Sequence, residues 1–111
     1  MLKKLFETLR ERCGVTKREF AEYFNSSVSF LRARYGDEYI TYDGTDAFPI
    51  SDEASPCPVC EEYIDGICDN IAYLKTGNEN YRVDFIAKSE YAYRTVWRMR
   101  IKNKRVKGES W

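Results

Sequence analysis

The chain has no histidine among its 111 residues, and its six glycines are scattered singly. Without an imidazole, the usual activation of a serine or cysteine nucleophile is unavailable. Without a glycine-rich loop, there is no phosphate-binding turn. Acidic residues cluster in the middle of the chain, but such clusters usually form solvated surface rather than an acid/base pair. We therefore expect no enzymatic activity and no cofactor.

Long apolar runs are also lacking, and none approaches the ~20 residues that a helix needs to span a bilayer. The first residues, Met-Leu-Lys-Lys-Leu-Phe, resemble the start of a signal peptide. The apolar segment that should follow is interrupted by Glu7, Arg10, Glu11 and Arg12. We expect an intracellular, uncleaved protein that does not enter a membrane.

Net charge is absent overall, because 18 basic side chains balance 18 acidic ones, but the charges are segregated. Residues 1–36 carry eight basic and four acidic side chains (+4), residues 37–80 one and eleven (−10), and residues 81–111 nine and three (+6). These blocks could face one another within a folded monomer, or, in an assembly, an acidic face of one subunit could meet a basic face of the next.

Apolar residues recur at helical spacing and predict a mainly α fold, a small bundle of about four helices in one domain of residues 1–111. The first helix should end at Gly14. The second should begin after Thr16, since Glu19 completes a capping box, and continue unbroken for ~19 residues to a left-handed Gly36. Its apolar stripe comprises Phe20, Phe24, Val28, Leu31 and Tyr35.

Two further helices are predicted over Pro58–Lys75 and Glu79–Lys107, antiparallel because the turn between them is short. The apolar stripe of the third is made by Val59, Cys60, Tyr63, Ile64, Ile67, Cys68, Ile71 and Leu74, and that of the last by Tyr81, Phe85, Ala92, Val96 and Met99. The last helix would be ~43 Å long. A compact chain of this size has a radius of gyration near 13 Å. The end of the last helix should therefore protrude from the body, with residues 98–111 forming a basic projecting or flexible extension.

Between the second and third helices, residues 39–50 predict a protruding loop or small hairpin. Asp43-Gly44 between β-prone residues is a hairpin signal, whereas Asp46 and Pro49 weaken the second strand.

The four cysteines suggest a metal site, because Cys57-Pro-Val-Cys60 has the spacing of half a zinc site and Cys68 and Cys13 could complete it. The second C-x-x-C pair that zinc usually requires is missing. Cys60 and Cys68 also fit a buried helix face, where cysteine behaves as a small hydrophobe. A zinc-stabilised interaction module is therefore the third functional hypothesis.

Residues 17–34 resemble a helix-turn-helix, in which Arg32 and Arg34 would face DNA. Asn25 and Ser26 stand where that motif usually has glycine and an apolar residue, and the neutral chain lacks the basic footprint of a DNA-binding protein. A DNA-binding regulator is the second hypothesis.

The order of elements resembles the small helical head–tail connector (adaptor or head-completion) proteins of tailed bacteriophages. The resemblance lies in a short first helix, the capped Thr16-x-x-Glu19 helix ending Phe30-Leu-Arg-Ala-Arg-Tyr-Gly36, a loop that exits through Pro49-Ile50, and a closing helical pair. The turn of that pair is contained in Ile71-Ala-Tyr-Leu-Lys-Thr-Gly-Asn-Glu-Asn-Tyr-Arg-Val-Asp-Phe85.

This resemblance implies a structural virion protein of the neck, assembled in the host bacterial cytoplasm. It would form a homo-oligomeric ring beneath the portal protein, continue the channel through which double-stranded DNA passes without sequence recognition, and offer a platform to the next neck or tail-completion protein. An acidic loop lining that channel would keep DNA from adhering.

By the same resemblance, the final helix would dock onto the portal through Arg94, Trp97, Arg98, Arg100, Lys102, Lys104, Arg105 and Lys107. The loop would contact a neighbouring subunit or line the channel through Asp37, Glu38, Tyr39, Tyr42, Asp43, Gly44, Asp46 and Phe48.

Overall fold

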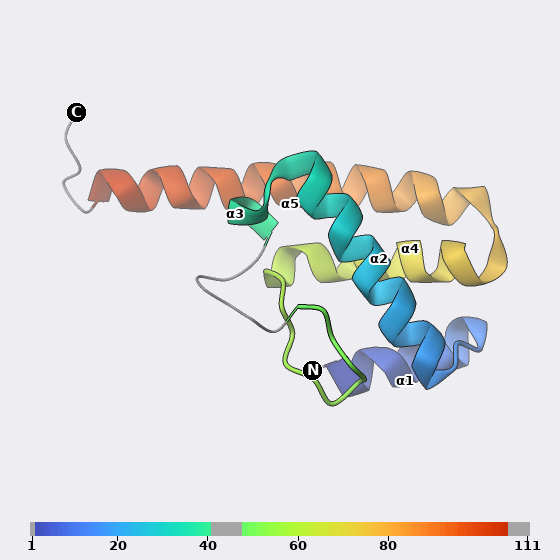
Figure 1. The fold of residues 1–111 in the computed structure, drawn as a ribbon. Coiled ribbons are helices and arrows are strands. Elements are labelled where there is room, and N and C mark those ends of the chain that lie inside the picture. The colour runs from blue at the N-terminus through green and yellow to red at the C-terminus, as the bar shows by residue number, and fades with distance from the viewer. Residues whose placement is uncertain (1, 41–47, 107–111) are drawn as a thin grey trace.

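The computed structural model of the chain describes the backbone of residues 2–40 and 48–106, and within them all side chains except those of residues 37, 38 and 102–106. The described elements are helical, which confirms the predicted fold class (Figure 1). They are α1 (Leu2–Cys13), α2 (Lys17–Tyr35), the short α3 (Asp37–Ile40), a 3₁₀ turn η1 (Glu61–Tyr63), α4 (Ile64–Thr76) and α5 (Glu79–Val106).

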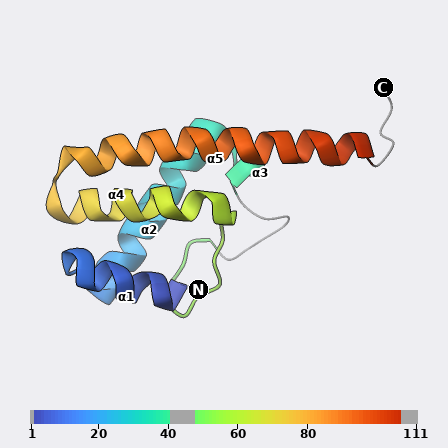
Figure 2. The ribbon, with the colours of Figure 1, turned by 180° about the vertical axis from the view of Figure 1, so that it is seen from behind.

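The centre of the bundle is the antiparallel pair of α4 and α5, which Figures 1 and 2 show side by side. Helix α2 lies across this pair. Helix α1 packs on α4, on the side away from α5. Gly77 ends α4 in the left-handed conformation (φ 75°, ψ 8°) and donates its N–H to the Tyr73 carbonyl. The predicted antiparallel arrangement is therefore confirmed.

The predicted boundary between α1 and α2 is confirmed in detail. Gly14 takes a positive φ of 75° and donates its N–H to the Arg10 carbonyl at 2.9 Å. The backbone N–H of Glu19 donates to Thr16 Oγ1 at 3.1 Å, and the Thr16 N–H donates to Glu19 Oε1 at 2.9 Å. Both halves of the capping box are thus formed.

The Glu19 carboxylate also receives the Lys75 ammonium, whose Nζ lies 3.0 Å from each oxygen. The hydrogen bond from the Thr16 N–H, and then the bond from Lys75, hold the pKa of Glu19 below its ordinary value. A lowered folded-state pKa contributes stability above the unfolded value near ~4.3 and loses it as the pH falls through the folded value. The cap of α2 is therefore sensitive to acid.

We expect Thr16→Ala to lower the free energy of unfolding by about 1 kcal/mol at neutral pH, because one end of the capping box is lost. Glu19→Gln should be less sensitive to acid than the unaltered chain, since its amide oxygen still accepts from Thr16 but has no proton to gain. Urea unfolding from pH 7 down to pH 3 measures both effects. Parallel pH profiles for the Glu19→Gln and unaltered chains would show that this carboxylate contributes no acid sensitivity.

Helix α2 is one unbroken helix of 19 residues, as predicted. In its middle, the Ser27 hydroxyl donates to the Tyr23 carbonyl at 2.8 Å, within the helix. The Asn25 side chain bonds the backbone of Ile50: its Nδ2 donates to the Ile50 carbonyl, and its Oδ1 accepts from the Ile50 N–H, each at 2.9 Å. Because residues 17–34 contain no turn, the helix-turn-helix interpretation is wrong. At the end of α2, Gly36 has positive φ (90°) but an extended ψ of 141°, which leads into α3 instead of a left-handed cap.

The predicted start of the third helix is wrong, because η1 begins at Glu61 and α4 only at Ile64. The backbone before it is extended, with Cys60 at φ −61° and ψ 141°, and the Cys60 N–H donates to the Ile40 carbonyl at 2.9 Å. Pro58 thus precedes the helical region instead of lying in its first turn. Tyr39 and Ile40, which the sequence suggests as extended, are helical in α3. The predicted hairpin turn at Asp43-Gly44 lies outside the described residues.

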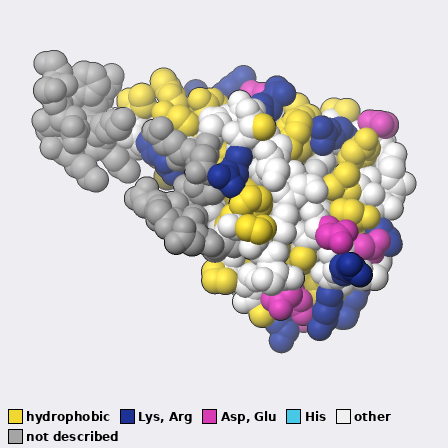
Figure 3. Space-filling model, viewed as in Figure 1, with side chains coloured by type: hydrophobic (Ala, Val, Ile, Leu, Met, Phe, Trp, Pro, Cys, Tyr) yellow, Lys and Arg dark blue, Asp and Glu magenta, His cyan; other side chains and the backbone are white. Residues whose placement is uncertain are grey.

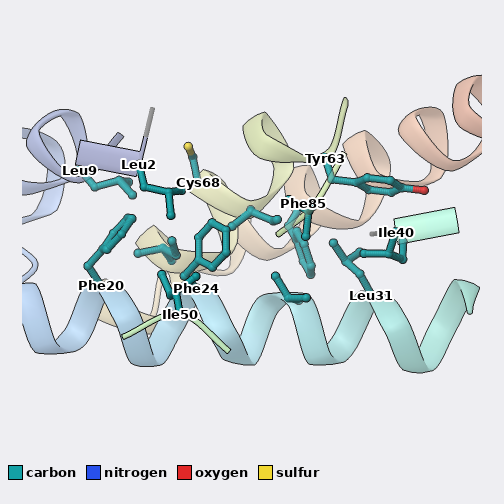
Figure 4. Packing of buried hydrophobic residues seen from close by; sticks show 14 of the residues in the cluster. Leu2, Leu9, Phe20, Phe24, Leu31, Ile40, Ile50, Tyr63, Cys68 and Phe85 are labelled. Atoms are coloured by element: carbon teal, nitrogen blue, oxygen red, sulfur yellow. The ribbon is translucent and has the colours of Figure 1, made fainter. Parts of the chain in front are cut away.

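The core runs through the body between α2 and the three helices around it (Figure 4). It is built from the predicted apolar stripes, including Phe20, Phe24, Leu31, Ile67 and Phe85, all fully buried. Two members of the predicted stripes are instead exposed, Leu74 by 38% and Met99 by 49%. Met99 lies on the part of α5 that continues past the beginning of α4, so α4 does not cover it.

Candidate docking surface on α5

Helix α5 is longer than the body on which it packs. Its 28 residues extend ~42 Å at 1.5 Å per residue, and the molecule measures 50 × 28 × 21 Å with a radius of gyration of 14.8 Å. Figures 1 and 2 both show α5 continuing past the beginning of α4. The helix therefore offers surface that no other described element covers.

That surface is rich in exposed apolar side chains. Of the five large hydrophobic side chains exposed in the described part of the chain, four belong to α5: Val83 (65%), Tyr91 (73%), Trp97 (43%) and Met99 (49%). Arg94 and Arg98 are exposed among them. In Figure 3, hydrophobic and basic side chains are interspersed along the upper edge of the molecule, over α5. We call the exposed residues Val83, Tyr91, Arg94, Trp97 and Arg98 the α5 outer surface.

The two arginines of the α5 outer surface form no ion pair within the described residues, although Arg94 has a Coulombic interaction with Glu90. Glu90, one helical turn before Arg94, binds Arg34 at 2.8 Å. The bond from Arg34 also holds the pKa of Glu90 below its ordinary value. Aromatic residues and arginine are the types enriched at protein interfaces, where lysine and glutamate are depleted. This composition favours contact with a protein over a merely solvated face.

Arg100 differs from the other predicted docking residues, because its side chain turns back to the body. Its guanidinium donates to Cys60 Sγ at 3.7 Å and lies 5.7 Å from the centre of the Tyr39 ring. Tyr39 also meets the Tyr93 ring edge-on at 5.6 Å, and Tyr35 stacks on the same ring at 4.7 Å. These contacts fix the base of the projecting part of α5 to α3 and to the end of α2.

The remaining predicted docking residues are only partly described. Lys102, Lys104 and Arg105 belong to α5 by backbone, and Lys107 lies outside the described residues. Among the predicted loop residues, Tyr39 packs on α5 as stated above, and Phe48 lies half-buried under the Arg32 guanidinium at 4.9 Å. Both ends of the loop are thus held on the body. Asp37 and Glu38 are in α3 by backbone, and Tyr42, Asp43, Gly44 and Asp46 lie outside the described residues.

The structure does not gather the cysteines into a metal site. All four are free, and in the described segments no group of three or more Cys, Asp or Glu side chains is placed to hold a metal ion. Burial raises the pKa of all four thiols, that of Cys68 to about 12. Because metal ligation requires thiolates, this environment does not favour zinc.

Sequence reasoning did not identify Val83 and Tyr91 as surface residues of interest. Their spacing could have indicated their exposure, because both are large apolar side chains that lie outside the apolar stripe of α5. It also did not identify a polar network inside the bundle, made by Asp69 and Asn70 of α4. Asp69 meets Arg12 and Lys88, and Asn70 bonds Ser27 and Arg82.

No protein-family model matches the chain, and no curated protein or solved structure is significantly similar to it. The part of the chain that the structure describes contains no helix long and apolar enough to cross a membrane.

Proposed function

We propose that this protein is a structural component of a tailed-phage neck, in which a ring of identical subunits joins the portal protein to the tail and continues the DNA channel. The main support for the proposal is that α5 projects from the body. Its side chains Arg94, Trp97 and Arg98 are exposed and are not covered by the packed core. The resemblance in the order of elements supplies the identity of the larger partner.

In this role α5 acts as a rigid rod that reaches from the body to the portal. Rigidity matters, because ordering a flexible tail on binding would lower its affinity. The stacking of Tyr35 and Tyr39 around Tyr93, together with the contact of Arg100 with Cys60, holds the rod at a defined angle. The proposed partner surface is acidic with an apolar centre, since the residues offered to it are two arginines and a tryptophan.

The ring itself would use the segregated charges, because a heterologous contact brings different faces of successive subunits together. The loop of residues 39–50 would reach the neighbouring subunit or the next neck protein, and its acidic residues would face the channel. Double-stranded DNA would then pass without sequence recognition.

The proposal predicts capture of a portal protein. We expect the tagged chain, co-produced with the proteins encoded by the genes flanking its own, to retain a portal protein, and electron microscopy to show an added ring on it. Trp97→Ala should weaken this binding at least about tenfold, because exposed tryptophans at interface centres are frequent energetic anchors. A matched control is Tyr73→Ala, which alters a half-buried aromatic residue away from the α5 outer surface.

Binding assays at equal protein concentration, with circular dichroism to verify folding, give the comparison. If a folded Trp97→Ala chain binds the portal as well as the unaltered chain does, α5 is not the docking element. If none of the neighbouring gene products is retained, the neck assignment is removed.

A further inference from the structure

Three exposed side chains form a straight line on α5 at intervals of seven residues. Asp84, Tyr91 and Arg98 are two helical turns apart in succession, so they share one side of the helix. All three are exposed, Tyr91 by 73%. In the described part of the chain, none of their side chains forms a hydrogen bond or an ion pair.

The line is self-complementary under a two-fold axis. At 1.5 Å per residue, Asp84 and Arg98 each lie ~10.5 Å along the helix from Tyr91, in opposite directions. A two-fold axis through Tyr91 makes a second α5 antiparallel to the first. It then places Asp84 of each copy opposite Arg98 of the other, with the two Tyr91 rings in contact. Such an isologous contact uses the same patch on both subunits.

We propose that a second copy of this chain binds the α5 outer surface in this antiparallel arrangement. Charge complementarity indicates a second copy, because the acidic end of the line, Asp84, matches the basic end, Arg98, of an antiparallel copy. Of the nearby charges, Lys88 and Glu90 already have partners within the subunit. Lys88 lies 2.7 Å from Asp69 and 3.3 Å from Asp65, and Glu90 binds Arg34. Ala87, exposed beside the line, is small enough to let two helices approach closely.

The contact is small, so the dimer is weak. From Asp84 to Arg98 the line measures ~21 Å, a single helix face that buries less than the interfaces of stable complexes. Association should therefore depend on protein concentration and, because its charged pairs are exposed, on salt. Arg98 belongs to this contact and to the docking surface proposed above, so the second copy and the larger partner exclude each other.

Charge exchange in the full-length chain tests the arrangement. Sedimentation velocity over a concentration series at low salt should show a monomer–dimer equilibrium. Asp84→Arg and Arg98→Asp should each weaken dimerisation about tenfold, because each change places like charges together twice. The double variant Asp84→Arg/Arg98→Asp should restore association, since the pairs are re-formed with reversed signs. Lys4→Glu, a charge reversal at an exposed position of α1, should leave it unchanged.

Three outcomes would overturn the proposal: a chain that stays monomeric throughout the series, a double variant as weak as the single ones, or a Lys4→Glu chain weakened equally. Portal capture is measured separately. A monomeric chain that still binds a portal would remove the dimer alone, whereas a charge-dependent dimer without portal binding would remove only the proposed function.

Discussion

Replacing Gly66 by leucine should lower the free energy of unfolding by about 3 kcal/mol, one of the two largest effects we expect from a change in this chain. Gly66 lies in α4 where that helix packs on α5. A Cβ placed on it would be 3.2 Å from Ser89 Oγ, 3.4 Å from Lys88 Cβ and 3.5 Å from the Phe85 carbonyl oxygen. The first of these contacts is already tight, and the last is to backbone, which cannot turn aside.

A leucine at this position must therefore push the two central helices apart or take a strained rotamer. Gly66→Ala should be far milder, because its single methyl group needs only a small shift of the Ser89 hydroxyl. Alanine also has a higher helix propensity than glycine, which favours the variant by about 1 kcal/mol and offsets part of the cost of that shift. Urea unfolding followed by circular dichroism measures both variants.

Ser29→Leu is the matched control, since it introduces the same side chain at an exposed position of α2 and should change stability by no more than about 0.5 kcal/mol. Equal stability of the Gly66→Leu and Ser29→Leu chains would mean that α4 and α5 are not in close contact at Gly66.

Removing both cations from Asp69 should have the second large effect. The Asp69 side chain is 3% exposed, and Arg12 Nη2 donates to its Oδ1 at 3.1 Å. Lys88 Nζ forms an ion pair with Oδ2 at 2.7 Å. With Arg12→Met and Lys88→Met combined, this carboxylate is left buried without a counter-charge. We expect a loss of about 3 kcal/mol or more.

Removing the acid should cost less than removing both bases, because the two cations are not similarly trapped. The side chains of Arg12 and Lys88 are 37% and 42% exposed, so water can solvate them when Asp69 is neutral. Asp69→Asn, which keeps an oxygen for Arg12, should therefore cost about 1 kcal/mol. Urea unfolding of the unaltered chain, both single cation variants, their combination and Asp69→Asn gives this order. An Asp69→Asn chain less stable than the double cation variant would contradict it.

Local chemistry made several helix ends predictable. Thr16 and Glu19 satisfy each other's backbone groups within four residues, and Gly14 and Gly77 take positive φ values that other residues rarely adopt. The stripe of α2 was equally clear, because its periodicity requires no knowledge of what packs on it.

The beginning of α4 could not be predicted in this way. Pro58 suits the first turn of a helix, but the backbone around Cys60 instead pairs with Ile40, twenty residues earlier in the chain. Met99 shows the same limitation, since its spacing matches a buried stripe while α4 does not extend far enough to cover it. A pattern within one helix specifies which face is apolar, not whether a neighbour reaches that face.

The candidate docking surface was also only partly predictable from the sequence. Length, periodicity and the basic residues near its end indicated from the amino acids alone that the last helix would outreach a small bundle. Which of its side chains are offered to a partner was decided by packing: Arg100 is drawn to Cys60 and Tyr39, whereas Tyr91, Trp97 and Arg98 remain exposed. Helix formation depends on neighbours within a few residues, but exposure depends on contacts between distant segments, which exist only once the chain has folded.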